Sequence, residues 1–156
     1  MKLPPLALAL AASSAAFAQA PDCTGFAGQA PAGVSVQTEL IAGDSVRPPG
    51  ATSGPLLAAH CRVSGRFGER VGADGKAYHV GFELRLPLAW NGRLLYQGGG
   101  GNDGVVRPAV GPQAAPGYAL NRGFAVVTTD AGHQGPMADF GFDPIARIDN
   151  AYNAHD

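Results

Sequence analysis

Trp90-Asn-Gly-Arg-Leu-Leu-Tyr-Gln-Gly-Gly-Gly-Gly-Asn-Asp-Gly104 is the most informative run of residues in the chain. An apolar strand, Leu94 to Tyr96, leads directly into four consecutive glycines, Gly98 to Gly101. Because glycine lacks a Cβ atom, its backbone readily adopts positive φ and lies close to a ligand. Four glycines at the end of a strand therefore predict a loop that presents backbone N–H groups. Close packing of strands is the alternative reason for such a turn.

The strands predicted before this run are antiparallel. Val34 to Ile41 alternates loosely and predicts a short strand, and His60 to Phe67 predicts a second. Tyr78 to Leu86 has the clearest period of two in the chain, which predicts one buried face. The apolar positions expected on that face are Tyr78, Val80, Phe82, Leu84 and Leu86. Asp74-Gly75 favours a hairpin between the strands His60 to Phe67 and Tyr78 to Leu86. Pro87 ends the second of these strands because proline cannot donate a hydrogen bond to the neighbouring strand.

The elements predicted from Gly92 onward alternate between strand and helix. Gly92 to Gln97 is the strand before the glycines, and Ala114 to Asn121 is expected to hold a short helix stopped by Gly123. Phe124 to Thr129 is a continuous apolar and β-branched run, typical of a parallel strand covered on both faces. Ala146 to Asp156 predicts the start of a helix. This order predicts an α/β fold whose sheet is incomplete within the chain.

The N-terminal residues 1–18 predict a secretory signal peptide. Lys2 precedes an apolar run from Leu3 to Ala12, and small residues end at Ala16-Phe17-Ala18, an A-x-A cleavage site. The apolar run is too short for a transmembrane anchor. The mature chain is therefore expected to begin at Gln19, in a secreted or periplasmic protein.

Cys23 and Cys61 are the only cysteines. In an oxidising compartment an even number of cysteines predicts a disulfide, and two cysteines alone cannot form a structural zinc site. The formal net charge is −1 and no polybasic block is present, which argues against nucleic acid and anionic membranes as partners. A hydrophobic content of 46% with 23 glycines and 13 prolines indicates a globular, loop-rich protein.

A dinucleotide site is the first chemical interpretation of the glycines that we considered. Gly99-x-Gly101-x-x-Gly104 matches the glycine pattern of dinucleotide-binding proteins. Asp130 follows the next predicted strand, where such proteins have the acidic residue that binds the ribose. That site requires a helix to begin directly after the glycines, but Pro108 and Pro112 interrupt the stretch. No Gly-Lys-Ser/Thr follows either, which excludes a phosphate P-loop.

An oxyanion hole is the interpretation that we favour. Glycine-rich loops after a strand supply backbone N–H groups that stabilise the tetrahedral intermediate of ester hydrolysis. The candidate donors are Gly99, Gly100 and Gly101. Asp103 is a candidate for ordering this loop or for a simple turn, and Asp130 and His133 are expected to order loops by hydrogen bonds. We assign no metal to His60, His79 or His155, which lack metal-ligand spacing.

Several motifs in series resemble the tannase and feruloyl esterase family. They are Trp90-Asn-Gly-Arg, the glycine run to Gly104, Asn121-Arg-Gly-Phe-Ala-Val-Val-Thr-Thr-Asp-Ala-Gly-His133 and Phe140-Gly-Phe-Asp-Pro144. The resemblance spans about Cys61 to Asp156. It implies the N-terminal portion of an α/β-hydrolase sheet, with antiparallel hairpin strands leading into parallel strands with helices. It also implies hydrolysis of aromatic-acid esters, feruloyl, galloyl or similar, by Ser, His and Asp. The expected substrate is a small aromatic ester or a plant-polymer ester.

The nucleophile that this family carries, in a Cys-x-Ser-x-Gly-Gly turn, has no counterpart in the chain. The six serines lie outside such a motif: Ser13, Ser14, Ser35, Ser45, Ser53 and Ser64. We therefore expect residues 19–156 to be the N-terminal part of a catalytic domain, truncated before the nucleophile and inactive alone, with no triad member present. No cofactor is expected, although the resemblance implies calcium in the lid of some full-length relatives. A non-catalytic secreted β-rich binding module, or an inactive truncated gene product, is the alternative.

Overall fold

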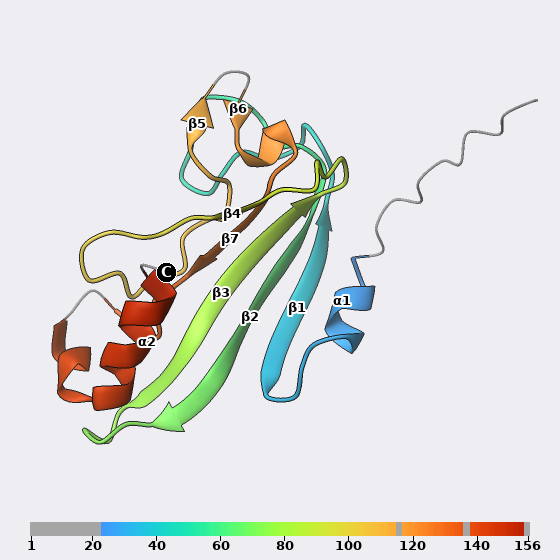
Figure 1. Cartoon of the computed structure of the whole chain (residues 1–156). Coiled ribbons are helices and arrows are strands. Elements are labelled where there is room, and N and C mark those ends of the chain that lie inside the picture. Colours follow the sequence, from blue (N-terminus) through green and yellow to red (C-terminus); the bar gives the residue numbers. More distant parts are fainter. Residues whose placement is uncertain (1–22, 115–116, 136–137, 155–156) are drawn as a thin grey trace, which may run out of the picture.

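The computed structural model describes residues 23–114, 117–135 and 138–154, so the predicted signal peptide, 1–18, lies outside the described residues. A five-stranded mixed sheet, in the order β1-β2-β3-β7-β4, forms the centre of the molecule (Figure 1). The strands of this sheet are β1 (Val34–Ile41), β2 (His60–Val71), β3 (Ala77–Pro87), β4 (Leu94–Tyr96) and β7 (Ala125–Thr129). The other elements are α1 (Gly25–Gly28), β5 (Gln113–Ala114), β6 (Gly117–Tyr118), η1 (Leu120–Arg122), η2 (Ala138–Phe142) and α2 (Pro144–Ala154).

The antiparallel half of the sheet, β1 to β3, follows the sequence prediction closely. β1 has the predicted bounds and pairs with β2 along its whole length. The predicted hairpin joins β2 to β3, and Gly75 adopts φ +78° in its turn. β2 continues past the predicted end at Phe67 as far as Val71, through an irregularity in register between Phe67 and Arg70. A period of two is broken by such a bulge, which explains why the sequence pattern stops early.

The parallel half of the sheet consists of β7 and β4. β7 pairs with β3 in the antiparallel sense and with β4 in the parallel sense, so it is a central strand as its apolar sequence predicts. β4 is an edge strand, because no described strand pairs with its other side. The expected partial α/β-hydrolase architecture, antiparallel strands leading into parallel ones, is confirmed.

The helix predicted over Ala114 to Asn121 is wrong. β5 and β6 pair there as a two-stranded antiparallel sheet, and a single 3-10 turn, η1, follows. Proline disfavours helical backbone at the residue before it, so Pro116 opposes a helix through this stretch. Gly123, with φ +84°, does end the 3-10 turn in the left-handed conformation, as the sequence suggested.

Helix α2 begins two residues before the predicted start at Ala146. Pro144 occupies its first position, where a missing N–H costs nothing. The carboxylate of Asp143 accepts the Ala146 N–H at 2.7 Å and so caps the helix. Ile145, Ile148 and Tyr152 are all more than half exposed on this helix. Residues 155 and 156 of the predicted helix lie outside the described part.

The burial of β3 differs from the prediction of one buried face. Tyr78 and Val80 are buried as expected, but Phe82, Leu84 and Leu86 are only half-buried. Arg85, on the opposite face, is 3% exposed, and its Nε lies 2.6 Å from the Glu83 carboxylate. The loop after β4 covers that face, because the Ala109 N–H donates to Glu83 at 2.9 Å.

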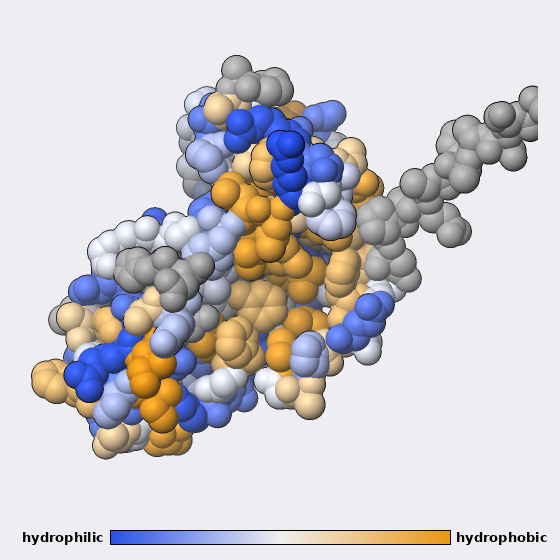
Figure 2. All heavy atoms as spheres, in the orientation of Figure 1, coloured by the Kyte–Doolittle hydropathy of each residue, from blue (hydrophilic) through white to orange (hydrophobic). Residues whose placement is uncertain are grey.

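The main apolar core lies under the loops of that covered face. Its buried members are Leu57, Ala109, Val110, Ala119, Leu120 and Val126. Figure 2 shows further apolar side chains over the middle of the sheet face turned to the viewer, between α1 and α2. Among the described residues, no helix has the length and apolar content needed to cross a bilayer.

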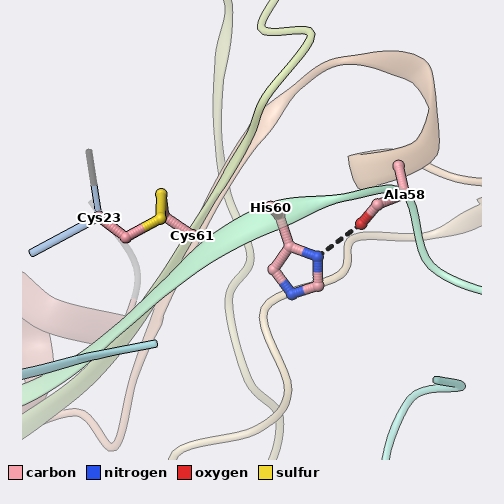
Figure 3. The surroundings of a disulfide bond; sticks show 4 residues. All are labelled: Cys23, Ala58, His60 and Cys61. Atoms are coloured by element: carbon pink, nitrogen blue, oxygen red, sulfur yellow. Dashed lines mark hydrogen bonds between the residues drawn. A yellow bond between two sulfur atoms is a disulfide. The ribbon is translucent and has the colours of Figure 1, made fainter. Parts of the chain in front are cut away.

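The predicted disulfide joins Cys23 to Cys61, with Cα atoms 5.4 Å apart (Figure 3). Cys61 is fully buried in β2, so the bond fixes the segment before α1 to the sheet. Next to it, His60 is also fully buried, and its Nδ1 lies 2.6 Å from the Ala58 carbonyl oxygen. Burial lowers the pKa of His60 below its ordinary value, and the neighbouring positive charge of Arg85 acts in the same direction.

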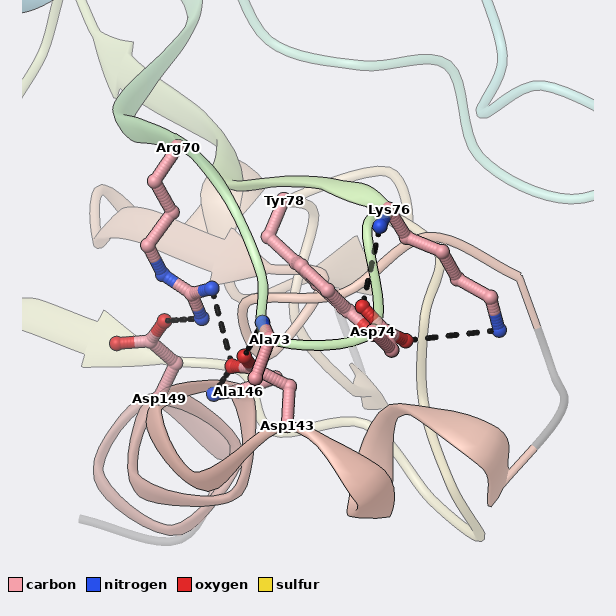
Figure 4. Close-up of polar contacts among 8 residues, drawn as sticks. All are labelled: Arg70, Ala73, Asp74, Lys76, Tyr78, Asp143, Ala146 and Asp149. Atoms are coloured by element: carbon pink, nitrogen blue, oxygen red, sulfur yellow. Dashed lines mark hydrogen bonds and ion pairs between the residues drawn. The ribbon is translucent and has the colours of Figure 1, made fainter.

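A cluster of three charged side chains, Arg70, Asp143 and Asp149, joins the β2–β3 hairpin to α2 (Figure 4). We call it the hairpin clamp. Arg70 lies 3.0 Å from the Asp143 carboxylate and 3.2 Å from that of Asp149. Asp143 is 2% exposed and also accepts the Ala73 N–H at 2.7 Å. The backbone N–H groups of Ala73 and Ala146, together with Arg70, hold the pKa of the Asp143 carboxyl below its ordinary value.

Candidate functional site

Gly98 to Gly101 form an exposed loop at the carboxyl end of β4, which we call the glycine arch. Asp103 closes the arch by two contacts. Its carboxylate accepts the Gly100 N–H at 2.9 Å, and its own N–H points to the Gly100 carbonyl at 3.4 Å. Gly101 has φ +68° and Asp103 has φ +54°, so the turn uses left-handed backbone at both positions.

The three candidate donors differ in what their N–H groups do. The Gly100 N–H is taken by Asp103. Within the described part of the chain, the N–H groups of Gly99 and Gly101 have no hydrogen-bond acceptor. Gly99 and Gly101 therefore have N–H groups available to a ligand, whereas Gly100 has a structural bond.

Gly99 and Gly101 require glycine for different reasons, and Gly100 does not. A Cβ atom at Gly99 would lie 1.4 Å from the Asp103 carboxylate, and side chains at Gly101 are strained by its positive φ. A Cβ atom at Gly100 would meet nothing within 4 Å. Substitution at Gly100 is thus the mildest of the three.

The two ends of the arch are fixed by neighbouring strands and loops. On one side, the Gln97 N–H donates to Val127 at 2.8 Å, and the Gln97 side chain bonds Pro108 and Gly111 at 3.1 and 2.7 Å. On the other side, the Gly104 N–H donates to the Asp130 carbonyl at 3.1 Å. The arch is therefore an exposed segment held between two ordered flanks.

The loop after β7, residues 130–135, packs against the second flank. Asp130 is 3% exposed, and one of its carboxylate oxygens accepts the N–H groups of Gly81 and Gly132, each at 3.0 Å. Gln134 donates to the other oxygen at 3.0 Å. Ala131 is buried with φ +61°, a conformation that costs an L-residue on the order of 1–2 kcal/mol. Backbone strain of this kind is concentrated at functional sites.

His133 joins this loop to the arch. Its ring is 1% exposed, and Nε2 lies 2.5 Å from the Asn102 carbonyl oxygen. The ring stacks on Phe140, with centroids 3.9 Å apart and planes 11° apart. The structure thus brings the candidate residues Asp103, Asp130 and His133 together with the glycines, at the carboxyl ends of two parallel strands.

Sequence reasoning missed two residues that shape this site. The Gln97 side chain holds the loop after the arch by hydrogen bonds to Pro108 and Gly111. Its position between the strand and the glycines is the only sequence feature that could have indicated this role. Phe140, seven residues after His133, packs on the His133 ring, and no local sequence pattern predicts that contact.

The site contains no nucleophilic serine in the described residues. The serines of this part of the chain lie in β1, in β2 and in the loop between them, and none lies in β4, in β7 or in the described loops that follow these two strands. In residues 23–114, 117–135 and 138–154 there is also no group of three or more His, Cys, Asp or Glu side chains arranged to hold a metal ion.

A family model described as tannase and feruloyl esterase matches residues 61–156, more than half of the chain. Mono(2-hydroxyethyl) terephthalate hydrolase of Piscinibacter sakaiensis is 40% identical over an alignment of 121 residues that covers 69% of this chain and 20% of that protein. An uncharacterized esterase of Agrobacterium fabrum is 34% identical over 85 residues, 51% of this chain and 15% of the relative. The chain thus spans about a fifth of the length of the curated relatives it matches.

A solved esterase structure is also similar to this chain in fold. The crystal structure of an esterase from Aspergillus oryzae superimposes with a TM-score of 0.57 at 25% sequence identity. The match covers 82% of this chain and 25% of the esterase.

Proposed function

The chain belongs to the tannase and feruloyl esterase family, and from this premise we propose that it is the N-terminal part of a longer, exported carboxylic ester hydrolase. Its relatives are named a hydrolase and an esterase, and the matched segments cover only 20% and 15% of their lengths. In this proposal residues 19–156 supply part of the catalytic sheet and the oxyanion hole. The Ser, His and Asp of the triad are encoded beyond residue 156.

The glycine arch is the observation that carries this proposal. When a nucleophile attacks an ester carbonyl, the carbonyl oxygen becomes negatively charged and requires hydrogen-bond donors already in place. The N–H groups of Gly99 and Gly101 are exposed donors without a protein acceptor in the described part of the chain, on a loop fixed at both ends. Such donors do not have to break a protein hydrogen bond before they bind the oxyanion.

The free edge of β4 supports the placement of the nucleophile. Parallel strands have their carboxyl ends at the same edge of the sheet, so a strand added in parallel to β4 would end beside the glycine arch. In α/β-hydrolases the serine lies on a sharp turn directly after such a strand. The chain after β4 crosses to β7 on the other side, so this edge would become a topological switch point, where ligands bind in α/β sheets.

We propose esters of aromatic acids, feruloyl, galloyl or similar, as substrates, either small or on a plant polymer. One relative, 40% identical, is named for mono(2-hydroxyethyl) terephthalate, which is itself an ester of an aromatic acid. The Cys23–Cys61 disulfide supports a secreted or periplasmic location, because such bonds persist in oxidising compartments. Serine ester hydrolysis itself needs no cofactor.

Sequencing the genomic DNA past codon 156 tests the proposal first. We expect an open reading frame that continues to a Cys-x-Ser-x-Gly-Gly motif. The complete protein should then hydrolyse methyl ferulate or methyl gallate, and replacing the motif serine by alanine should abolish turnover. A stop codon followed by unrelated sequence would instead favour a secreted binding module or an inactive gene product.

A further inference from the structure

His133 is a buried imidazole to which the proposed hydrolysis gives no chemical role. It lies on the loop after β7, but its hydrogen bond reaches the loop after β4, 31 residues earlier in the chain. A group that joins the two loops beside the glycine arch can control how the arch is held.

The hydrogen bond at His133 identifies which ring nitrogen carries a proton. The Asn102 carbonyl oxygen can only accept, so Nε2 of His133 must be the donor. The other nitrogen, Nδ1, is buried and has no partner among the described residues. The Asn102 contact is therefore the polar interaction that orients this ring.

Packing confines the ring to one position. Phe140 stacks on His133 at 3.9 Å between ring centroids. Gly104 leaves room for the ring, because a Cβ atom at Gly104 would lie 2.9 Å from Cε1 of His133 and 2.0 Å from the Gly135 carbonyl oxygen. The ring thus fits a slot that only a glycine at position 104 leaves open.

The effect of the hydrogen bond is transmitted through one peptide plane. The carbonyl of Asn102 and the N–H of Asp103 belong to the same planar peptide group, so fixing the oxygen also fixes the direction of the N–H. That N–H points to the Gly100 carbonyl at 3.4 Å, and the Asp103 carboxylate holds the Gly100 N–H at 2.9 Å. The chain of contacts therefore runs from His133 through Asn102 and Asp103 to the middle of the arch.

We propose that His133 is a positioning residue for the oxyanion hole: it holds the peptide between Asn102 and Asp103 so that the N–H groups of Gly99 and Gly101 keep a fixed direction. This inference rests on the proposed function, and it gives a role to a buried residue outside the proposed triad. It predicts that the donor on the ring matters for turnover more than the ring itself.

Three substitutions in the complete enzyme separate these properties. His133→Phe keeps the stacking surface for Phe140 and removes the donor. His133→Gln keeps an amide donor of similar reach and removes the aromatic ring. His79→Phe, the same substitution at a half-buried histidine of β3, is the matched control.

The first readout is hydrogen exchange of the peptide that contains residues 98–104, which does not depend on activity. His133→Phe should speed exchange in this peptide, while His133→Gln and His79→Phe should leave it nearly unchanged. Unchanged exchange in His133→Phe would overturn the inference, whatever the enzyme hydrolyses.

The second readout is the kinetics of ester hydrolysis. Misplacing a catalytic group by about 1 Å costs on the order of 10²-fold, so His133→Phe should lower kcat by roughly 10- to 100-fold with KM little changed. His133→Gln should restore most of the lost kcat. Faster exchange with normal kcat in His133→Phe would overturn the positioning role and leave the proposed esterase intact. A complete protein without any ester hydrolysis would overturn both, and the exchange result would still report whether His133 holds the loop.

Discussion

The two halves of the sheet are stabilised in different ways. The antiparallel half, β1 to β3, has strands of 8, 12 and 11 residues, joined in sequence order and tied by a disulfide and by the hairpin clamp. The parallel half has strands of 3 and 5 residues, one free edge and long loops. The first half is stabilised mostly by contacts within itself. The second half carries the candidate site and depends on contacts between distant loops.

This difference separates residues that maintain the fold from residues that serve the proposed reaction. In the hairpin clamp, Asp143 is buried, and Arg70 and Asp149 are half-buried. The Asp143 carboxylate accepts hydrogen bonds from two backbone N–H groups and pairs with the Arg70 side chain. The glycine arch is exposed, and the N–H groups of Gly99 and Gly101 have no acceptor within the described residues. Changes in the antiparallel half should therefore lower stability and leave turnover per folded molecule unchanged, while changes in the arch should do the reverse.

The largest expected effect is the absence of activity in the 156-residue chain alone. An oxyanion loop without a nucleophile and base gives at most weak catalysis, so the purified chain should not turn over methyl gallate or methyl ferulate. The complete protein, assayed in parallel, is the control. Turnover by the short chain that a serine-directed inhibitor abolishes would show that the nucleophile lies within residues 19–156.

Removing the disulfide should give the largest loss of stability in the antiparallel half. With a separation of 38 residues, the Cys23–Cys61 bond stabilises by up to about 4 kcal/mol on the chain-entropy model. The double variant Cys23→Ser/Cys61→Ser should lose free energy of unfolding in urea and keep its kcat per folded molecule. Mass spectrometry of non-reduced peptides from exported protein should show the cross-link. Two free thiols after export would contradict the pairing.

Neutralising the hairpin clamp should give a smaller loss that depends on pH. Since the folded-state pKa of Asp143 is held below its ordinary 3.8, its charge stabilises the fold above that pH, and the contribution disappears as the pH falls through the lowered value. Asp143→Asn should lower Tm at pH 7 by roughly 2–4 °C. Asp44→Asn, at an exposed position, is the control. A Tm equal to that of the control would show that the clamp contributes no stability.

The smallest expected effect is at His60. Its folded-state pKa lies below the ordinary 6.5 because of burial, so below pH 6.5 the unfolded chain takes up the proton first. Stability should therefore decline from about pH 6.5 down to the lowered pKa, with a slope of at most about 1.4 kcal/mol per pH unit, and change no further below it. His60→Gln should remove this part of the pH dependence, and His79→Gln should retain it. Identical pH profiles for both variants would argue against the buried neutral histidine.

The antiparallel half could be predicted from sequence because its signals are local. Alternation over Val34 to Ile41 gives β1 its correct bounds, and Asp74-Gly75 identifies the hairpin turn. One failure comes from contacts made far along the chain: the loop that contains Ala109 bonds Glu83 and covers the Arg85 face of β3, and the alternation within β3 cannot show this. The other failure is local. The β5–β6 pair forms where a short helix is expected over Ala114 to Asn121, a stretch that contains Pro116.

For the candidate site, the sequence shows which residues share a loop but not which residues make contact. The glycines and Asp103 are adjacent in sequence, so their role in one loop follows from position. The hydrogen bond from His133 to Asn102 joins the loops after β7 and β4, which are close because these two strands pair. The sequence predicts the fold class but not which two strands are neighbours.

The most direct test of the oxyanion assignment compares kcat per folded molecule with Tm for variants of the glycine arch in the complete enzyme. Loss of one oxyanion donor costs on the order of 10²–10³ in turnover. Valine keeps the backbone N–H, but its Cβ atom would collide with Asp103 at position 99 and strain the positive φ at position 101, which moves the N–H from its place. Gly99→Val and Gly101→Val should therefore lose about that much kcat, while KM changes far less and the protein stays folded. Gly100→Ala should be the mildest variant, because its Cβ atom meets nothing within 4 Å and its N–H is already held by Asp103. Near-normal turnover per folded molecule in every variant, with lowered Tm, would contradict the assignment and leave the glycines with a purely structural role.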